Sequence, residues 1–494
     1  MRKIGFDNDK YISLQTQNIR DRISTIGGKL YMEFGGKLFD DYHAARVLPG
    51  FKPDSKLRML MEMKDEAEIV IAIAANAIEQ NKRRGDSGIT YDQEVMRLID
   101  AFHEIGLYVG SVVVTMYADQ PAAKAFEKKL TSLGIKVYRH YHIADYPSNV
   151  AHIISEDGFG KNDYIETSRS LVVITAPGPG SGKMETCLSQ LYHDHMRGIK
   201  AGYAKFETFP IWNIPLKHPV NLAYEAATAD LNDVNMIDPY HLATYGETTV
   251  NYNRDIEIFP VLQAMFTKIF GKSPYQSPTD MGVNMAGFCI VDDDVVCDAS
   301  KQEIVRRYYN ALCNVRKGMS EQSEVMKLEL IMNSLGVTTD IRPIVAAAAA
   351  VSERTDGPAV AVELDDGRIV TGKTSNLLGA SSAVLINLLK VLGDIDDKYD
   401  LISPSIIEPI QKLKVNNMGN HNPRLHMDEV LIALSVCALT DERAKIALEQ
   451  LPKLRGCEAH STVILSSVDV NVFHKLGMNL TCEPKYQTKK LYHR

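Results

Sequence analysis

Residues 171–191 read LVVITAPGPGSGKMETCLSQL and place a strand pattern, a glycine-rich turn and a helical pattern in direct succession. The run 171–175 is apolar and β-branched, which is typical of a strand buried on both faces. The residues PGPGSGK at 177–183 then interrupt the apolar pattern, and an amphipathic stretch follows them. A strand that leads through a short turn into a helix predicts the α/β fold class.

The segments before this stretch repeat the same alternation. Apolar runs at 69–74, 111–116 and 135–142 alternate with helical patterns at 92–105 and 122–133. Strands that alternate with helices favour βαβ units, because parallel strands need a crossover connection. The sequence therefore predicts a largely parallel sheet with helices on both faces.

A short repeat lies near the start of the chain. Gly27-Gly28-Lys29-Leu30 recurs as Gly35-Gly36-Lys37-Leu38, and the residues between the glycine pairs, KLYMEF, form a strand pattern. Glycines usually serve backbone geometry. We therefore expect two turns around one strand, in a meander at a sheet edge, and no ligand role.

The chain divides into three regions by its pattern. Residues 1–210 form the α/β domain with the glycine-rich turn, and residues 211–330 are mainly helical. A strand pair is expected within the helical region, at 288–290 and 295–298, joined by three aspartates. Residues 331–494 predict a separate C-terminal α/β sandwich of ordinary domain size.

The glycine-rich turn is the candidate binding site. Glycines let backbone N–H groups converge on an anion, and the N-terminal end of the following helix adds positive potential. We expect Gly178, Gly180, Ser181 and Gly182 to cradle a phosphate and Lys183 to neutralise its oxygens.

The turn departs from the phosphate-loop motif at two positions. Pro177 stands where the motif has its first glycine, and Met184 stands where it has a serine or threonine that binds Mg²⁺. A magnesium ion would have to be held otherwise, with Ser181 and Thr186 as nearby hydroxyls, or no metal-dependent hydrolysis occurs. The alternative is a tight structural turn in which Lys183 is merely solvated.

Four further residues are candidates for auxiliary roles around a phosphate. His43 and Arg46 follow the repeat, while Asp238 and Asp280 each follow a short apolar or proline-containing segment. A carboxylate such as Asp238 could hold Mg²⁺ in a phosphoryl-transfer site. The alternative for each is a helix cap or a surface ion pair.

We predict no metal site from the sequence. Cys457 and His460 have C-x-x-H spacing, with His421 and His426 upstream, but zinc needs four ligands at defined spacing. No G-x-S-x-G or H-E-x-x-H motif is present, so neither a serine hydrolase nor a zinc hydrolase is indicated.

Composition sets the broad class. The 494 residues include 55 Lys and Arg against 62 Asp and Glu, a net charge of −7. With no long basic run, no apolar leader and no apolar stretch of about 20 residues, the chain is expected to bind neither nucleic acid nor membrane. The seven cysteines are irregularly spaced, so we expect a reduced, cytoplasmic protein. A homo-oligomer is a separate expectation, which belongs to the assembly hypothesis.

Three segments carry a family resemblance. YMEFGGKLFDDYHAARVLPGF at 31–51, APGPGSGK at 176–183 and AHSTVILSSVDVNVFHKLGMNLTCEP at 459–484 resemble a bacterial family of unknown function, domain of unknown function eighteen forty-six. The resemblance covers essentially the whole chain. It implies no catalytic residues, because the family brings no established activity with it.

The C-terminal region also resembles a cytidine-deaminase-type topology, with a hairpin around Asp366-Gly367 and then a helix. The zinc pattern H-x-E followed by P-C-x-x-C is absent, so this resemblance implies a domain that binds a metabolite or serves assembly. Two functions stay open. One is binding of a nucleotide or phosphorylated metabolite, with phosphoryl transfer as the enzyme hypothesis, and the other is a non-catalytic metabolite-binding or oligomeric assembly protein.

Overall fold

The computed structural model describes residues 3–35, 38–39, 41–84 and 88–488. The chain forms two compact units, the N-terminal unit (residues 4–300) and the C-terminal unit (from residue 301 onward). The three-part division after residues 210 and 330 stays a prediction about domains.

The helices and strands follow one another along the chain as expected for an α/β protein. The helices of the N-terminal unit are α1 (Asn8–Ile26), α2 (Tyr42–Val47), α3 (Ser55–Glu62), α4 (Ala75–Glu79), α5 (Tyr91–Glu104), α6 (Pro121–Ser132), α7 (Val150–Ile153), α8 (Lys183–Met196), α9 (Pro219–Ala227), α10 (Pro239–Tyr245), α11 (Asn253–Phe270) and α12 (Pro278–Met281). Its strands are β1 (Lys29–Phe34), β2 (Ala67–Ala74), β3 (Tyr108–Tyr117), β4 (Val137–Tyr141), β5 (Leu171–Thr175), β6 (Ala201–Phe206), β7 (Asn235–Ile237), β8 (Val250–Tyr252) and β9 (Gly282–Val283).

Helix α13 (Asp293–Lys317) begins in the N-terminal unit and ends in the C-terminal one. The further helices of the C-terminal unit are α14 (Gln322–Ser334), α15 (Pro343–Thr355), α16 (Ala380–Leu392), α17 (Pro404–Lys412), α18 (Met427–Cys437), α19 (Glu442–Glu449) and α20 (Ser467–Lys475). Its strands are β10 (Ala359–Glu363), β11 (Ile369–Lys373), β12 (Glu458–Ser461) and β13 (Asn479–Cys482).

A parallel sheet organises the N-terminal unit. Within the described residues its order is β4-β3-β2-β5-β1-β6-β9, and every neighbouring pair is parallel. The prediction of an α/β fold with a largely parallel sheet is therefore confirmed. The strands that the sequence located best, β2 and β5, are buried along their whole length, as continuous apolar runs indicate.

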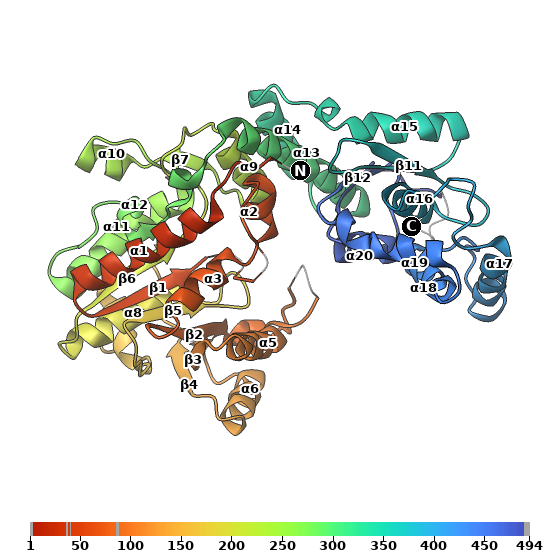
Figure 1. The fold of residues 1–494 in the computed structure, drawn as a ribbon. Coiled ribbons are helices and arrows are strands. Elements are labelled where there is room, and N and C mark those ends of the chain that lie inside the picture. Colours follow the sequence, from red (N-terminus) through yellow and green to blue (C-terminus); the bar gives the residue numbers. More distant parts are fainter. Residues whose placement is uncertain (1–2, 36–37, 40, 85–87, 489–494) are drawn as a thin grey trace. The chain divides into compact units, whose positions relative to one another are not determined.

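Helices cover both faces of this sheet (Figure 1). Side chains alternate along a strand, and the Tyr31 hydroxyl donates a 2.7 Å hydrogen bond to Asp194 of α8, so Tyr31 and Glu33 of β1 lie on the α8 face. Helix α11 packs against α8 on this face. Helices α1, α3 and α5 pack on the opposite one.

The meander predicted around the glycine repeat is wrong. Strand β1 lies inside the sheet, between β5 and β6 and parallel to both. Its two charged residues hide its buried character in the sequence: Lys29 donates to Thr167 Oγ1 at 2.8 Å, and Glu33 accepts from the Tyr203 hydroxyl at 2.9 Å. The second glycine pair includes Gly36, which lies outside the described residues.

The strand pair predicted at 288–290 and 295–298 is also wrong. Residues 295–298 belong to α13, because the preceding aspartates start a helix and do not form a hairpin turn. Asp292 Oδ1 accepts a hydrogen bond from the Val295 N–H at 3.2 Å, and acidic residues in a first turn complement the helix dipole.

The connections that leave β2 and β5 run in opposite directions along the strand order of the sheet. Strand β2 leads to its neighbour β3, whereas β5 leads through α8 to β6 on the far side of β1. In open parallel sheets the carboxyl edge at such a switch in direction is where ligands usually bind. The turn at 176–182 lies at this switch.

The C-terminal unit is built on a mixed sheet in the order β11-β10-β12-β13. The expected hairpin around Asp366-Gly367 is present as the antiparallel pair β10–β11, and β12 and β13 are parallel. Helix α16 packs on one face of this sheet over a core that includes Val360, Val362 and Leu385. Helix α15 covers the other face, where Ala348 packs with Ala361.

Candidate ligand site at the carboxyl edge of the parallel sheet

The glycine-rich turn between β5 and α8 has a shape fixed by backbone hydrogen bonds. Gly180 and Gly182 have φ values of 76° and 81°, in the left-handed region that glycine adopts without strain. Ser181 Oγ donates to the Gly178 carbonyl at 2.9 Å, and Thr115 Oγ1 donates to the Ser181 carbonyl at 2.9 Å. The turn is therefore anchored to the end of β3.

Close neighbours also require two of these glycines. A Cβ on Gly178 would lie 2.2 Å from the Tyr91 hydroxyl, and one on Gly182 would lie 2.9 Å from the Thr115 side chain. These contacts favour glycine at both positions whether or not an anion binds.

The N-terminus of α8 is open. Gly182 is its N-cap residue and brings no capping side chain, and no hydrogen bond or ion pair joins the Lys183 ammonium to another described residue. The one acidic side chain of the first turn, Glu185, is engaged by His140 Nδ1 at 3.2 Å and Asn162 Nδ2 at 2.7 Å. The first N–H groups of α8 and Lys183 are therefore available to an anion.

The hydroxyls near the turn are engaged by the backbone. Ser181 and Thr186 are both buried, and Thr186 Oγ1 donates to the Gly182 carbonyl at 2.9 Å as Ser181 Oγ does to Gly178. Because both residues are buried, a magnesium ion could reach their hydroxyl oxygens only if the turn moved. The geometry thus supports anion binding more directly than metal binding.

A buried charged cluster, Glu33, Lys205, Glu207 and Asp255, lies at the carboxyl ends of β1 and β6. Lys205 Nζ is 2.9 Å from Glu207 Oε1 and also pairs with Asp255 in the first turn of α11. Glu33 lies directly beside Lys205 in the sheet register. One cation thus faces several carboxylates, of which Glu33 and Glu207 are buried, while Lys205 and Asp255 are partly buried.

Burial and the excess of carboxylates shift the pKa values of this cluster. Burial raises the pKa of Glu207 to about 7, opposed by Lys205 and supported by Asp255. Burial alone would lower the pKa of Lys205, but the carboxylates of Asp255 and Glu207 outweigh it and raise that pKa. A carboxyl group that titrates near neutral pH is suited to general acid–base chemistry.

We expect Glu207→Gln to change how stability depends on pH. The folded-state pKa of Glu207, about 7, exceeds its ordinary value of 4.5, so ionisation favours the unfolded chain as pH rises between these values. Relative to the wild type, the variant should gain about 2 kcal/mol of unfolding free energy between pH 5 and pH 8. Urea unfolding at the two pH values measures this gain.

The matched control is Glu257→Gln, which removes an exposed carboxylate from α11. It should leave the difference between the two pH values unchanged. An equal response of the two variants would contradict a raised pKa at Glu207.

The auxiliary candidates lie in different surroundings. The His43 ring packs edge-on against Phe209 at 5.5 Å, and Arg46 lies in the last turn of α2. Asp238 is fully buried, caps α10 and accepts from Thr279 Oγ1 at 2.7 Å.

Asp280 belongs to the capping box of α12. Within the described residues, no hydrogen bond or ion pair joins Asp238 or Asp280 to the glycine-rich turn. Both carboxylates act as helix caps in this structure, so nothing here brings them to a phosphate on the turn.

The single tryptophan of the chain lies next to the charged cluster. A Cβ on Gly282 would stand 2.4 Å from the Trp212 ring and 3.2 Å from Glu207 Oε2, so the ring and the carboxyl group meet over this glycine. The Trp212 Nε1 atom is buried without a hydrogen-bond partner among the described residues.

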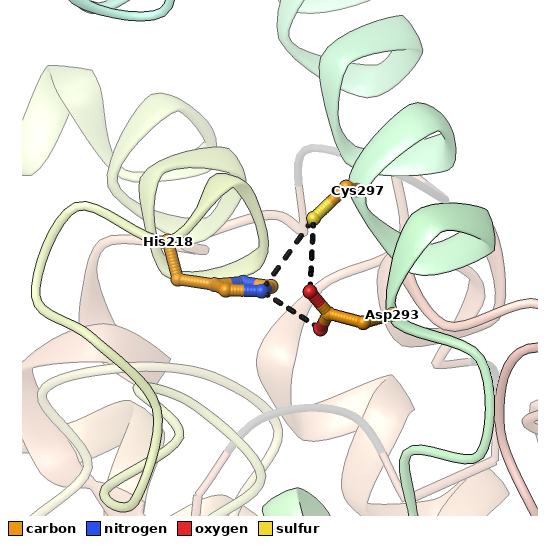
Figure 2. A group of neighbouring side chains, drawn as sticks. All are labelled: His218, Asp293 and Cys297. Atoms are coloured by element: carbon orange, nitrogen blue, oxygen red, sulfur yellow. Dashed lines mark hydrogen bonds and ion pairs between the residues drawn. The ribbon is translucent and has the colours of Figure 1, made fainter.

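A second polar cluster of the N-terminal unit, His218, Asp293 and Cys297, was not predicted (Figure 2). His218 Nε2 lies 3.0 Å from Asp293 Oδ1 and 3.5 Å from Cys297 Sγ. The two residues of α13 are four positions apart, on one helix face, but His218 is 75 residues away in sequence. That separation explains why sequence spacing alone did not reveal the cluster.

The hydrogen bonds of His218 bear on whether this cluster suits a metal ion. His218 Nδ1 accepts from the Val220 N–H at 3.2 Å, so in the neutral ring Nε2 carries the proton and donates to Asp293. A metal ion would need the lone pair of Nε2. The arrangement drawn in Figure 2 is therefore a hydrogen-bonded contact between His218 and α13. Metal binding at Nε2 would require the ring proton to move from Nε2 to Nδ1.

The cysteine and histidines considered from spacing do not gather. Cys457 is buried, and its thiol faces the Lys453 carbonyl. His460 Nδ1 contacts Thr481 Oγ1 at 2.9 Å, whereas His426 Nδ1 contacts Asp469 at 3.1 Å.

Among the described residues, a search for membrane-spanning helices finds none with the length and apolar character that a span requires.

The fold and the site define the class: a parallel α/β protein with an open glycine turn and buried carboxylates at one sheet edge, and a second α/β unit with a mixed sheet. Two family models cover the chain, "Domain of unknown function DUF1846, N-terminal" over residues 4–336 and its C-terminal counterpart over 340–492.

Relatives match over the full length. The UPF0371 protein of Streptococcus pyogenes serotype M28 is 60% identical over 492 residues, covering 100% of both chains, and that of Streptococcus sanguinis strain SK36 is 59% identical with the same coverage. The chain belongs to the DUF1846 family, and the predicted family resemblance is confirmed.

Proposed function

We propose that the N-terminal unit binds a phosphate-bearing small molecule, a nucleotide or a phosphorylated metabolite, at residues 177–183. The observation that carries the proposal is the open N-terminus of α8, with Lys183 unpaired among the described residues. Backbone N–H groups around Gly180, Ser181 and Gly182 would contact the phosphate oxygens, and Lys183 would balance their charge.

Two further features support a ligand at this edge. The turn lies where the connections of β2 and β5 diverge. Burial raises the pKa of the Cys187 thiol, one turn into α8, and among the nearby charges Glu33 raises this pKa while Lys183 lowers it. The turn and the buried carboxylates therefore both lie near Cys187, at the same edge of the sheet.

Phosphoryl transfer is the second candidate function. It is favoured by the raised pKa of Glu207, which suits a group that accepts a proton from an attacking hydroxyl near neutral pH. It is weakened by Met184, which has no hydroxyl, and by the burial of Ser181 and Thr186, which leave the turn without a ready Mg²⁺ ligand. Binding is therefore our conclusion, and transfer is the reaction to test once a ligand is found.

Lys183→Ala is expected to weaken binding of the phosphate-bearing ligand by roughly tenfold or more, because a charge-assisted contact is lost. A panel of nucleotides and sugar phosphates is screened by thermal shift, and the affinity of each hit is then measured by calorimetry for both proteins.

The control is Lys128→Ala, which removes an exposed lysine from α6 and should leave every affinity unchanged. Absence of stabilisation by any phosphate-bearing compound would overturn the proposal. So would a hit whose affinity is equal in the wild type and Lys183→Ala.

We also propose that the C-terminal unit shares the cytidine-deaminase topology. The antiparallel hairpin β10–β11, the helix α16, and the parallel pair β12–β13 around α20 support this. The first turns of α16 and α20 carry Ser381 and Ser467 and no histidine or cysteine, so the proposal excludes the zinc chemistry of that class.

A further inference from the structure

The C-terminal unit holds a pocket of about 1320 Å³ that the proposed function does not use. Its lining comes from the starts of α16, α18 and α20, from the segments 421–426 and 463–466 before two of these helices, and from residues 486–488. Three helices thus begin around one pocket, each with the positive end of its dipole there. The volume exceeds what a lone phosphate needs and suits a nucleotide-sized molecule.

Helix α16 differs from the other two in how it begins. Its N-cap residue, Gly379, offers no capping side chain, and its first turn has no acidic residue. By contrast, α18 starts with Asp428 and Glu429, and Asp469 lies in the first turn of α20. The open N–H groups of α16 are thus the ones that an anion could approach.

A hydroxyl without a hydrogen-bond partner among the described residues lies at the same place and is a second, independent indication of a ligand. Ser381, the second residue of α16, lines the pocket and is only 2% exposed. No hydrogen bond joins its hydroxyl to another residue in the part of the chain that the structure describes. The hydroxyl oxygen itself is not closed off from solvent, so it is accessible at the pocket wall, where a bound anion could accept its hydrogen bond.

The charges around the pocket favour an anion. The basic residues of the lining are Lys317, His421, Arg424 and His426, and Asp469 is the one acidic residue among those described. The Asp469 carboxylate is already engaged by the Met427 N–H at 3.0 Å, the Ser466 hydroxyl at 3.0 Å and His426 Nδ1 at 3.1 Å.

The charge of Asp469 is therefore balanced locally, and the hydrogen bond that it makes raises the pKa of His426. The remaining cations, among them Arg424, whose Nε atom donates to the Ser375 carbonyl at 2.7 Å, leave an excess of positive charge.

The same contacts argue against a nucleophilic serine. Ser466 Oγ and Asp469 Oδ2 both face the same nitrogen, His426 Nδ1, at 3.4 Å and 3.1 Å. A serine activated by histidine needs the two groups on opposite ring nitrogens. This cluster can orient and charge the pocket wall, but it is not arranged for acyl transfer.

We propose that this pocket binds a phosphomonoester, with the phosphate at the N-terminus of α16. The N–H groups at Ala380 and Ser381 and the Ser381 hydroxyl would donate to the phosphate oxygens, and Arg424 and Lys317 would balance its charge. The site is independent of the turn at 177–183 and does not rest on the function proposed for it.

The test uses a substitution that places a carboxylate where the phosphate is proposed to bind and leaves the fold intact. Gly379→Asp places a carboxylate at the N-cap of α16, where a Cβ meets only the Leu425 carbonyl at an ordinary 3.8 Å. Aspartate and asparagine are both good N-cap residues, so neither variant should melt below the wild type. Gly379→Asn is the matched neutral control.

Full-length protein is titrated with AMP and ribose 5-phosphate, and with adenosine and ribose as the compounds without phosphate. We expect the phosphomonoesters to bind the wild type at least about tenfold more tightly than their parents. Gly379→Asp should lose that preference and Gly379→Asn should keep most of it. Hydrogen exchange should slow at residues 376–385 and 463–471 on binding, also in the Lys183→Ala variant.

Three outcomes would overturn the proposal. The first is equal binding of phosphomonoester and parent compound, and the second is unchanged binding in Gly379→Asp. The third is protection confined to residues 176–190, which would assign the phosphate to the turn of the N-terminal unit and leave the C-terminal pocket without one.

Discussion

Lys205→Met is expected to lower the unfolding free energy of the N-terminal unit by about 3–5 kcal/mol near neutral pH, since it leaves buried carboxylates without their cation. Lys205 pairs with Glu207 and Asp255 and lies beside Glu33 in the sheet. The loss should be smaller at pH 5 than at pH 8, because a carboxyl group without a cation can take up a proton more readily at low pH. Urea unfolding at both pH values measures it.

Two variants test this explanation. Lys128→Met on the exposed face of α6 should lower the unfolding free energy only slightly, because that lysine is solvated. Lys205→Arg keeps the charge and should recover part of the loss. A cost below about 1 kcal/mol for Lys205→Met at pH 8 would show that the cation does not hold the cluster together.

Glu458→Gln is expected to destabilise the C-terminal unit by a similar amount, about 3–5 kcal/mol. Glu458 accepts from Arg306 Nη1 at 2.8 Å and from Arg342 Nη2 at 3.0 Å, and the Arg342 side chain is 1% exposed. Arginine does not shed its proton when its partner is removed, so among the described residues Arg342 would remain charged without a carboxylate, while Arg306 would keep Glu303 at 2.7 Å. Hydrogen exchange along β10 and β12 localises the loss.

The pH dependence of the wild type follows from the same contacts. Burial alone would raise the pKa of Glu458, but Arg306 and Arg342 outweigh it and lower that pKa below 4.5. The stabilisation is therefore present above pH 4.5 and is lost as pH falls through the lowered pKa.

The control for Glu458→Gln is Glu442→Gln, which changes a 75% exposed side chain paired only loosely with Lys445 at 3.4 Å. Glu442→Gln should lower the unfolding free energy by less than about 1 kcal/mol. Equal costs for the two glutamates would contradict the importance of the buried arginine pair.

The strands of the parallel sheet were predictable where burial leaves a continuous apolar run. Residues 171–175 coincide with β5, and the run 69–74 falls within β2. Strand β1 was misplaced at an edge, because the glycine pairs beside it were interpreted as hairpin turns, whereas its charged side chains, Lys29 and Glu33, are satisfied inside the unit. Partners that come from distant segments are not visible in a local pattern.

The same limit applies to the sites. The glycine turn was found from the sequence because its residues are contiguous. The charged cluster joins the ends of two strands to α11, and the C-terminal pocket joins the starts of three helices. The signal that could have indicated the cluster is a charged pair, Lys205 and Glu207, at the end of the strand pattern 201–206.

The position of Trp212 makes it an intrinsic fluorescence probe of the charged cluster. It is the single indole of the chain, and it touches the same glycine as the carboxyl group that titrates near pH 7. Its fluorescence therefore reports on the N-terminal unit, which contains it. Because the charge state of Glu207 changes the electric field at the indole, the emission wavelength also reports, without any added dye, when a ligand moves that proton.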